Sequence, residues 1–265
     1  FGDLQELDRS LSGYLGRRRL AGMAMPFGDT GTPPITIRPL TKGEADLIDL
    51  RMQSVRGVDR EAGQKLYAKA APIAARYDDD PVAQGWLAEM AFDAGENDAA
   101  LAAAAKALAR DPKSGQALLY QGRVKLRRLT DAKSTDAAAW NAARDSIIAA
   151  NRVDPDDPEP LWWFWQSFML QGIEPRASSI KGLYRAQELA PQDDIVRFAA
   201  AMARIEAGEI PAAQRLLRPL AYHPHAPADN PASRVLAALD AGKVGKAAIN
   251  AADAKEEGGA PTAAH

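Results

Sequence analysis

Residues 80–112 read DPVAQGWLAEMAFDAGENDAALAAAAKALARDP, and this stretch decides the fold class. Leu87 and Ala91 recur at helical spacing, so they share one face of a first helix. Gly95 interrupts the pattern, and Pro112 ends a second helix. The second helix places small residues on one face, namely Ala100, Ala104 and Ala107. The stretch therefore predicts one complete hairpin of two antiparallel helices.

The hairpin pattern recurs downstream at Gly172 and again at Gly208. A hairpin of this kind cannot bury its apolar face alone, so recurrence predicts a stack of hairpins, a solenoid. The repeats are uneven, because Pro112 and Pro155 are 43 positions apart whereas Gly172 and Gly208 are 36 apart. Against a period of about 34 residues, we expect an insertion of about nine residues in the polar stretch Leu129–Asp136.

The fold class expected is all-α, an α-solenoid of helical hairpins with a short N-terminal helix and an extended segment. Three parts are predicted along the chain. Residues 1–40 hold a helix over 2–20, a linker and the short extended segment Ile35–Arg38. Residues 41–242 form a solenoid of about four to five hairpins, and residues 243–265 form a flexible tail rich in Ala, Lys and Gly.

Composition excludes several classes of function. The net charge is −2, with 33 basic against 35 acidic residues, so no excess of positive charge attracts nucleic acid. The absence of cysteine excludes disulfides, thiolate metal sites and cysteine nucleophiles, and it is compatible with an oxidising compartment. No run approaches the roughly 20 apolar residues that span a bilayer. We therefore expect no nucleic-acid partner, no transmembrane segment, no cofactor and no metal.

Taken together, the hairpin residues resemble tetratricopeptide repeats (TPR) over roughly residues 42–225. The residues that carry the resemblance are Leu87, Ala88, Gly95, Ala100, Ala107, Pro112, Gly122, Ala143, Ala150, Pro155, Gly172, Gly208 and Ala213. The resemblance implies that a protein or peptide binds on a concave face lined by the first helices. Carried over to this sequence, that face comprises Glu89, Phe92, Asp93, Arg123, Leu126, Arg127, Trp162, Gln166, Met169, Leu170, Phe198, Met202 and Ile205.

A second resemblance concerns the N-terminal part. Leu7–Leu20 followed by Ile35–Ala45 is similar to the junction in some proteobacterial proteins, where a secreted, gluzincin-like peptidase domain precedes TPR repeats. The sequence begins at Phe1 rather than Met, so we expect it to be a processed form or a piece of a longer chain. The resemblance implies a C-terminal accessory part of a bacterial enzyme, and it favours a periplasmic or secreted location over a cytoplasmic one.

Two local clusters are candidates for the binding surface. Three tryptophans fall within residues 162–165, and two of them, Trp162 and Trp165, share a helical side. They form either an interface patch, because Trp dominates interface energetics, or a bulky filling beside alanine-rich helices. Arg123 and Arg127 share a face four residues apart, with Lys125 and Arg128 nearby. They either grip an anionic group or belong to a solvated face.

Other motifs are better explained by structure. The aspartates of 78–80 and 154–157 lack the ligand spacing of a calcium loop, and helix capping explains them. His223 and His225, with Asp229 nearby, are too few for a metal site and fit a turn. Ser178–Lys181 lacks the companion motifs of a serine–lysine enzyme, and Gly242–Lys246 lacks the spacing of a phosphate loop.

Three functions remain open. The sequence favours a non-enzymatic scaffold that binds a protein or peptide on the concave face. The first alternative is the accessory part of a secreted peptidase-like enzyme. The second is a structural or assembly subunit that self-associates through its Trp-rich face.

Overall fold

The computed structural model describes residues 3–16, 35 and 37–253, which divide into two compact units, Phe1–Pro39 and Leu40–His265. The first unit contains the predicted N-terminal helix, α1 (Leu4–Leu15), which begins at Asp3, whose side chain accepts a hydrogen bond from the backbone N–H of Gln5. Residues 35 and 37–41 form neither helix nor strand, and the rest of the predicted extended segment lies outside the described residues.

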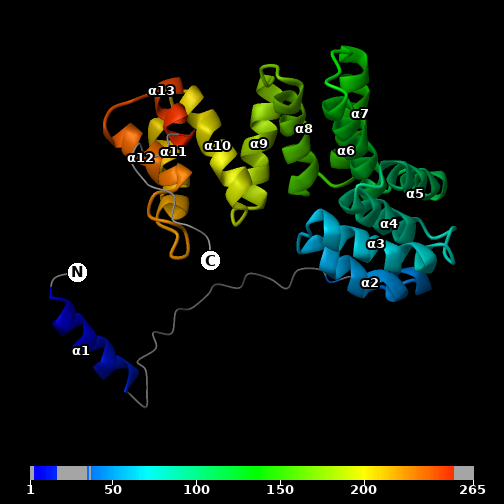
Figure 1. Cartoon of the computed structure of the whole chain (residues 1–265), viewed down its shortest axis with the longest axis horizontal. Coiled ribbons are helices and arrows are strands. Elements are labelled where there is room, and N and C mark those ends of the chain that lie inside the picture. Colours follow the sequence, from blue (N-terminus) through cyan, green and yellow to red (C-terminus); the bar gives the residue numbers. More distant parts are fainter. Residues whose placement is uncertain (1–2, 17–34, 36, 254–265) are drawn as a thin grey trace. The chain divides into compact units, whose positions relative to one another are not determined.

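The second unit is a succession of helical hairpins, so the all-α repeat prediction is confirmed (Figure 1). The hairpins are α2 (Lys42–Val55) with α3 (Arg60–Ala74), α4 (Pro81–Ala94) with α5 (Asn97–Arg110), α6 (Gly115–Asp131) with α7 (Ala137–Val153), α8 (Pro158–Gln171) with α9 (Ala177–Leu189), and α10 (Asp194–Glu206) with α11 (Ile210–Ala221). They are followed by α12 (Pro231–Asp240), α13 (Lys246–Ile249) and the 3-10 helix η1 (Asn250–Asp253). The described residues contain no strand.

The helix boundaries follow from local signals. Thr41 begins α2 with a capping box, in which its hydroxyl accepts the backbone N–H of Glu44 and the Glu44 carboxylate accepts that of Thr41. Asp80 caps α4 next to Pro81. Gly95 ends α4 at φ +83°, in the left-handed region that a side chain rarely adopts.

The extra residues of the α6–α7 hairpin lengthen its helices. Both helices have 17 residues, whereas α4 and α5 have 14 each. The prediction of an inserted loop over Leu129–Asp136 was therefore wrong for its first half, because α6 continues to Asp131. Thr130 remains helical with its hydroxyl bonded to the carbonyl of Leu126 at 2.9 Å. The insertion thus makes this hairpin longer than its neighbours.

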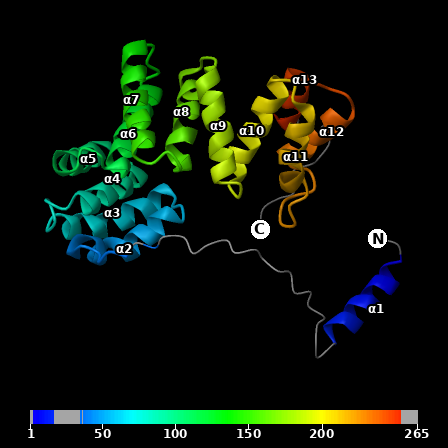
Figure 2. The same ribbon diagram turned by 180° about the vertical axis from the view of Figure 1, so that it is seen from behind.

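The first helices of the first four hairpins form a continuous row. α2 contacts α4, α4 contacts α6, and α6 contacts α8, in addition to the contacts within each hairpin. Among the described helices, comparable direct contacts are not found between the second helices α3, α5, α7 and α9. The first helices are therefore the more closely packed side of the stack, and Figure 2 shows the same succession of hairpins from behind. Small residues allow this approach, as where Gly43 of α2 faces Ala83 of α4.

The end of the stack differs from the expected flexible tail. Residues 246–253, placed in that tail by the sequence, form α13 and η1, and Ala248 is fully buried. The Arg234 guanidinium of α12 donates to the carbonyls of Ala251 and Ala252, at 3.3 and 2.6 Å. These contacts with α12 hold a segment that has no local signal for a helix.

Among the described helices, none has the length and apolarity needed to cross a membrane.

Candidate functional site

A polar hollow of about 250 Å³ lies on the row of first helices, and we call it the central hollow. It is lined by Arg51, Ser54, Val55, Gly57, Glu89, Asp93, Gln116, Tyr120, Arg123 and Glu159. Each of the first helices α2, α4, α6 and α8 contributes to this lining. The site therefore exists only because four hairpins stack, and no single repeat builds it.

Glu89 lies at the buried side of the central hollow with 4% of its surface exposed. Its Oε2 accepts a hydrogen bond of 2.5 Å from Nε2 of Gln116 and lies 3.5 Å from Nε of Arg51. Burial raises the pKa of Glu89 to about 7, and the charge of Arg51 opposes this only in part. The carboxyl group is therefore part protonated near neutral pH.

Asp93 connects the central hollow to a second one. Its Oδ2 accepts a 2.6 Å hydrogen bond from the hydroxyl of Ser54, and burial raises the pKa of this carboxyl group. The second hollow, of about 300 Å³, is lined by Arg60, Asp93, Gly95, Asn97, Arg127 and Asp131. Arg127 is held there, because it donates to the carbonyl of Phe92 at 2.7 Å and to Oδ1 of Asn97 at 3.2 Å.

Arg123 stands among three aromatic rings. Its guanidinium carbon lies 4.5 Å from the ring centre of Phe92, 4.6 Å from Tyr120 and 4.5 Å from Trp163. A cation held over aromatic faces is stabilised by the ring quadrupoles. An oxygen of the Glu159 carboxylate lies 3.8 Å from Nη1, beyond hydrogen-bond distance. Thus the rings, rather than an acid, position this guanidinium.

The tryptophans of α8 pack against different neighbours. Trp162 and Trp165 lie 5.1 Å apart and pack on the cluster that contains Leu183 of α9 and Val196 of α10. Trp163 packs instead on α4 and α6, and Phe168 is 1% exposed. Trp162 and Trp165 therefore pack at the junction between α8 and α10, which favours the packing interpretation for these two residues.

The other residues expected on the concave face are dispersed. Leu126 is 1% exposed among Trp140, Ala143 and Ile147, so its side chain is not available to a partner. Leu170 packs on the same cluster, and Ile205 is likewise buried in the C-terminal cluster. Phe198 and Met202 pack on that C-terminal cluster with α11 and α12. Gln166 is half-buried, and Met169 is 49% exposed.

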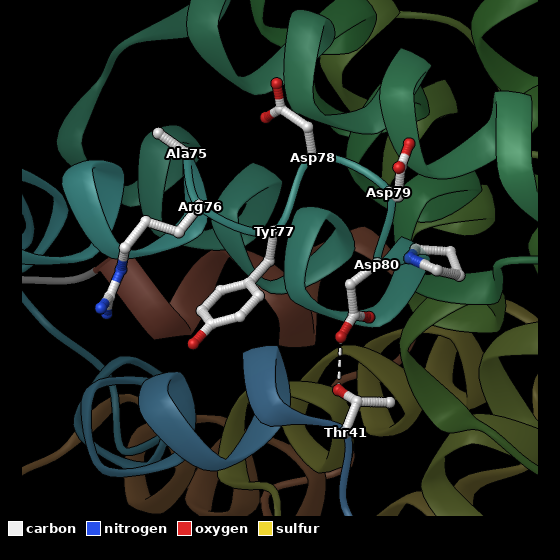
Figure 3. A pocket seen from close by; sticks show the side chains of 8 residues that line it. Thr41, Ala75, Arg76, Tyr77, Asp78, Asp79 and Asp80 are labelled. Atoms are coloured by element: carbon white, nitrogen blue, oxygen red, sulfur yellow. Dashed lines mark hydrogen bonds between the residues drawn. The ribbon is translucent and has the colours of Figure 1, made fainter.

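A third hollow, of about 530 Å³, is lined by side chains that connect neighbouring helices (Figure 3). Asp80 caps α4 through the backbone N–H groups of Val82 and Ala83, and its second oxygen accepts the hydroxyl of Thr41. Tyr77 donates to Asp46 at 2.5 Å. Two aspartates pair with α5, Asp78 with Lys106 and Asp79 with Arg110. These side chains thus join α2, α4 and α5, and the capping interpretation of Asp80 is confirmed.

The remaining polar motifs also have structural partners. Asp157 caps α8 by accepting the backbone N–H of Glu159 at 2.9 Å, and Asp156 pairs with Arg185. The rings of His223 and His225 lie 5.7 Å apart. Within the described residues, no group of three or more His, Asp or Glu side chains is arranged to hold a metal ion.

Seven residues of the central hollow are absent from the sequence prediction, namely Arg51, Ser54, Val55, Gly57, Gln116, Tyr120 and Glu159. Arg51 and Ser54 belong to the hairpin before the best-formed repeat, and Gln116 and Glu159 lie in the first turns of α6 and α8. The sequence offered one signal for Arg51 and Ser54, which is their position in the repeat pattern. The predicted face began at Glu89, and it could have been extended to the first helix of the preceding hairpin.

Comparison with solved structures supports the repeat architecture. A thermophilic TPR protein of Thermus thermophilus is similar with a TM-score of 0.54 and 17% identity, covering 69% of this chain and 91% of that chain. The chain has a TPR-like fold. MamA of Desulfovibrio magneticus RS-1 is also similar to this TPR-like chain, with a TM-score of 0.45 and 13% identity over 68% of this chain and 94% of that chain. No model of a protein family and no curated protein sequence matches it.

Proposed function

We propose that this TPR-like chain is a non-enzymatic scaffold that binds a protein or peptide on the row of first helices. The central hollow carries the proposal, because Arg51, Glu89, Arg123 and Glu159 come from four successive first helices and meet in one place. Charged groups are costly to hold in a half-buried position. Their convergence on the closely packed side of the stack therefore favours a binding role.

The size of the hollow indicates what kind of partner fits. At about 250 Å³ it is smaller than the roughly 300–1,000 Å³ of most small-molecule sites. It has room for one side chain of a larger partner rather than for a whole substrate or cofactor. Val55, which lines the hollow, is 55% exposed, and Met52, three residues before it on α2, is 53% exposed. A partner that covers this rim would bury apolar surface around a polar centre, as protein interfaces do.

Two charge-swapped variants with unchanged net charge test the proposal. The first, Arg51→Glu with Glu159→Arg, alters the central hollow, where these side chains are 28% and 49% exposed. The matched control, Lys106→Asp with Asp78→Lys, reverses an exposed ion pair between α5, a second helix, and the connection before α4. Each protein is used to capture partners from extracts of its source cells, followed by mass spectrometry. We expect the first variant to lose the proteins that wild type and control retain, whereas identical capture by all three would contradict the proposal.

The two alternative functions have separate tests. The tryptophan packing at the α8–α10 junction leaves less free surface for self-association than the sequence suggested, and light scattering over a range of concentrations measures that association directly. The peptidase-linked alternative and a periplasmic or secreted location stay predictions. A helical His-Glu-x-x-His segment encoded upstream in the same reading frame would support them.

A further inference from the structure

Two arginines of the central hollow lack hydrogen-bond acceptors. Nε of Arg51 and Nε of Arg123 are buried, and neither has a hydrogen-bond partner in the described part of the chain. The carboxylate oxygens that pair with these side chains lie at 3.5 Å in Glu89 and 3.8 Å in Glu159, too far or too poorly aligned for a hydrogen bond. Buried donors without acceptors cost free energy, so this pair of guanidiniums needs an explanation.

Two other arginines with buried guanidinium groups have acceptors, whereas Arg197 of α10 also has a buried Nε without a hydrogen-bond partner. Arg127 donates to Phe92 and Asn97, and Arg144 donates to the hydroxyl and the carbonyl of Ser167 at 2.8 and 3.1 Å. The fold therefore supplies acceptors for some of its buried guanidiniums. Arg127 lines the second hollow with its acceptors already in place, whereas Arg51 and Arg123 line the central hollow with a buried Nε that has none.

Two acids of the hollow accept their hydrogen bonds from groups other than the two arginines. Gln116 donates to Glu89, and Ser54 donates to Asp93. Glu159 is half-exposed at the rim, where it makes a long ion pair with Arg123. Burial raises the pKa of Glu89 to about 7, so this carboxyl group carries only part of a negative charge near neutral pH. It therefore repels an incoming anion less than a fully charged carboxylate would.

Both guanidiniums are held in place by aromatic rings. Arg51 lies 5.0 Å from the ring centre of Trp86, and Arg123 stands among Phe92, Tyr120 and Trp163. A planar guanidinium fixed in this way keeps its edge available, and that edge matches the two oxygens of a carboxylate. The hollow holds two guanidiniums and three carboxyl groups, so it suits a single carboxylate that displaces Glu159 and not a polyanion.

We propose that the central hollow binds the side-chain carboxylate of an aspartate or glutamate in a partner peptide, next to an apolar residue that packs on Met52 and Val55. This inference rests on the proposed function and names the partner's chemistry at the same site. The carboxylate takes the hydrogen bonds of Arg51 and Arg123 and displaces the Glu159 carboxylate from Arg123. The effects of Arg51 and Glu159 on binding consequently have opposite signs.

The test uses nine-residue peptides on an array, acetylated and amidated so that no terminal charge contributes. The central residue is Glu, Gln or Lys, the next is Leu, and the other positions are random mixtures. We expect Glu peptides to bind about ten- to a hundredfold more tightly than Gln peptides, the range that charge-assisted hydrogen bonds provide. Arg51→Lys keeps the charge but loses the planar fork, and it should lose most of this preference. The exposed Arg56→Lys on the same helix end is the control and should keep it.

Glu159→Gln separates recognition from a merely structural role. It removes the resident competitor of the peptide carboxylate, so Glu peptides should bind about two- to fivefold more tightly, the range of one exposed ion pair. A preference for Lys peptides, equal binding of Glu and Gln peptides, or weaker binding by Glu159→Gln would overturn the inference. A Gln peptide with a free C-terminus is a further arm, and binding of that peptide alone would overturn the side-chain assignment. None of these results decides the outcome of the capture experiment on the charge-swapped variants. Failure of the carboxylate inference can therefore be distinguished from failure of the scaffold proposal.

Discussion

The replacement Glu89→Gln should change how the stability of the protein depends on pH. Burial raises the pKa of Glu89 from 4.5 to about 7 in the folded chain. Between these values the folded state keeps a proton that the unfolded state has lost, so the free energy of unfolding falls as pH rises. At about 1.4 kcal/mol per pH unit, the loss attributable to Glu89 totals about 3 kcal/mol. Glutamine removes this contribution while it keeps an oxygen to accept the hydrogen bond from Gln116.

Urea denaturation of wild type and Glu89→Gln from pH 4 to pH 8.5 measures the effect. The stability of the variant relative to wild type should increase by about 3 kcal/mol from the acid to the alkaline end. The charged groups around Glu89 are Arg51, Asp93, Arg123 and Glu159. Asp93 and Glu159 also have pKa values raised by burial, and both proteins retain them, so the effect of their burial cancels in the difference.

Glu61→Gln is the matched control for this measurement, because its side chain is 77% exposed on α3. It should leave the pH profile of wild type unchanged. A stability difference between wild type and Glu89→Gln that stays constant across the pH range would refute the assignment of a buried, part-protonated carboxyl group.

Three further predictions concern packing and capping. Gly122→Ala should destabilise the protein by about 1–3 kcal/mol in thermal denaturation, because its new Cβ would lie 2.6 Å from Cγ1 of Ile147 and 3.1 Å from the carbonyl of Ala143. Gly85→Ala, whose Cβ meets no atom closer than 3.5 Å, should be neutral or stabilising by up to about 1 kcal/mol, and equal destabilisation by both would contradict the close approach of α6 and α7. Trp162→Ala should raise amide hydrogen exchange in α9 and α10 by about tenfold or more while α4 is unaffected, and a uniform rise would contradict its role at that junction. Asp80→Ala should lower the free energy of unfolding by about 1–2 kcal/mol through loss of the α4 cap, whereas the exposed Asp79→Ala should leave chemical denaturation unchanged.

The sequence predicts the hairpins because their signals are local. Asp80 with Pro81 begins a helix, Gly95 ends one, and the spacing of alanines places the core face. The end of the stack lacks such signals. Residues 246–253 read as a polar, alanine-rich tail, and they become helical because Ala248 is buried and Arg234 bonds to their carbonyls. Such contacts depend on tertiary structure and leave no periodic pattern.

The candidate site was only half predictable for a similar reason. Helical spacing placed Glu89, Asp93 and Arg123 on the first-helix face, where the structure brings them together. The same spacing placed Leu126 there, although α7 covers it. A period of 3.6 residues shows to which side of a helix a residue points, but it does not show how far the neighbouring helix extends over that side. Arg51 was missed because its partners lie 35 or more positions away along the chain.

Photo-cross-linking in the source cells tests the central claim most directly. A benzoyl-phenylalanine is introduced either at Val55, which lines the central hollow and is 55% exposed, or at Lys106 on α5, whose side chain is 48% exposed. A scaffold that binds its partner on the row of first helices predicts a discrete cross-linked adduct from position 55 and none from position 106. Adducts from position 106 alone, or the same adducts from both positions, would contradict it.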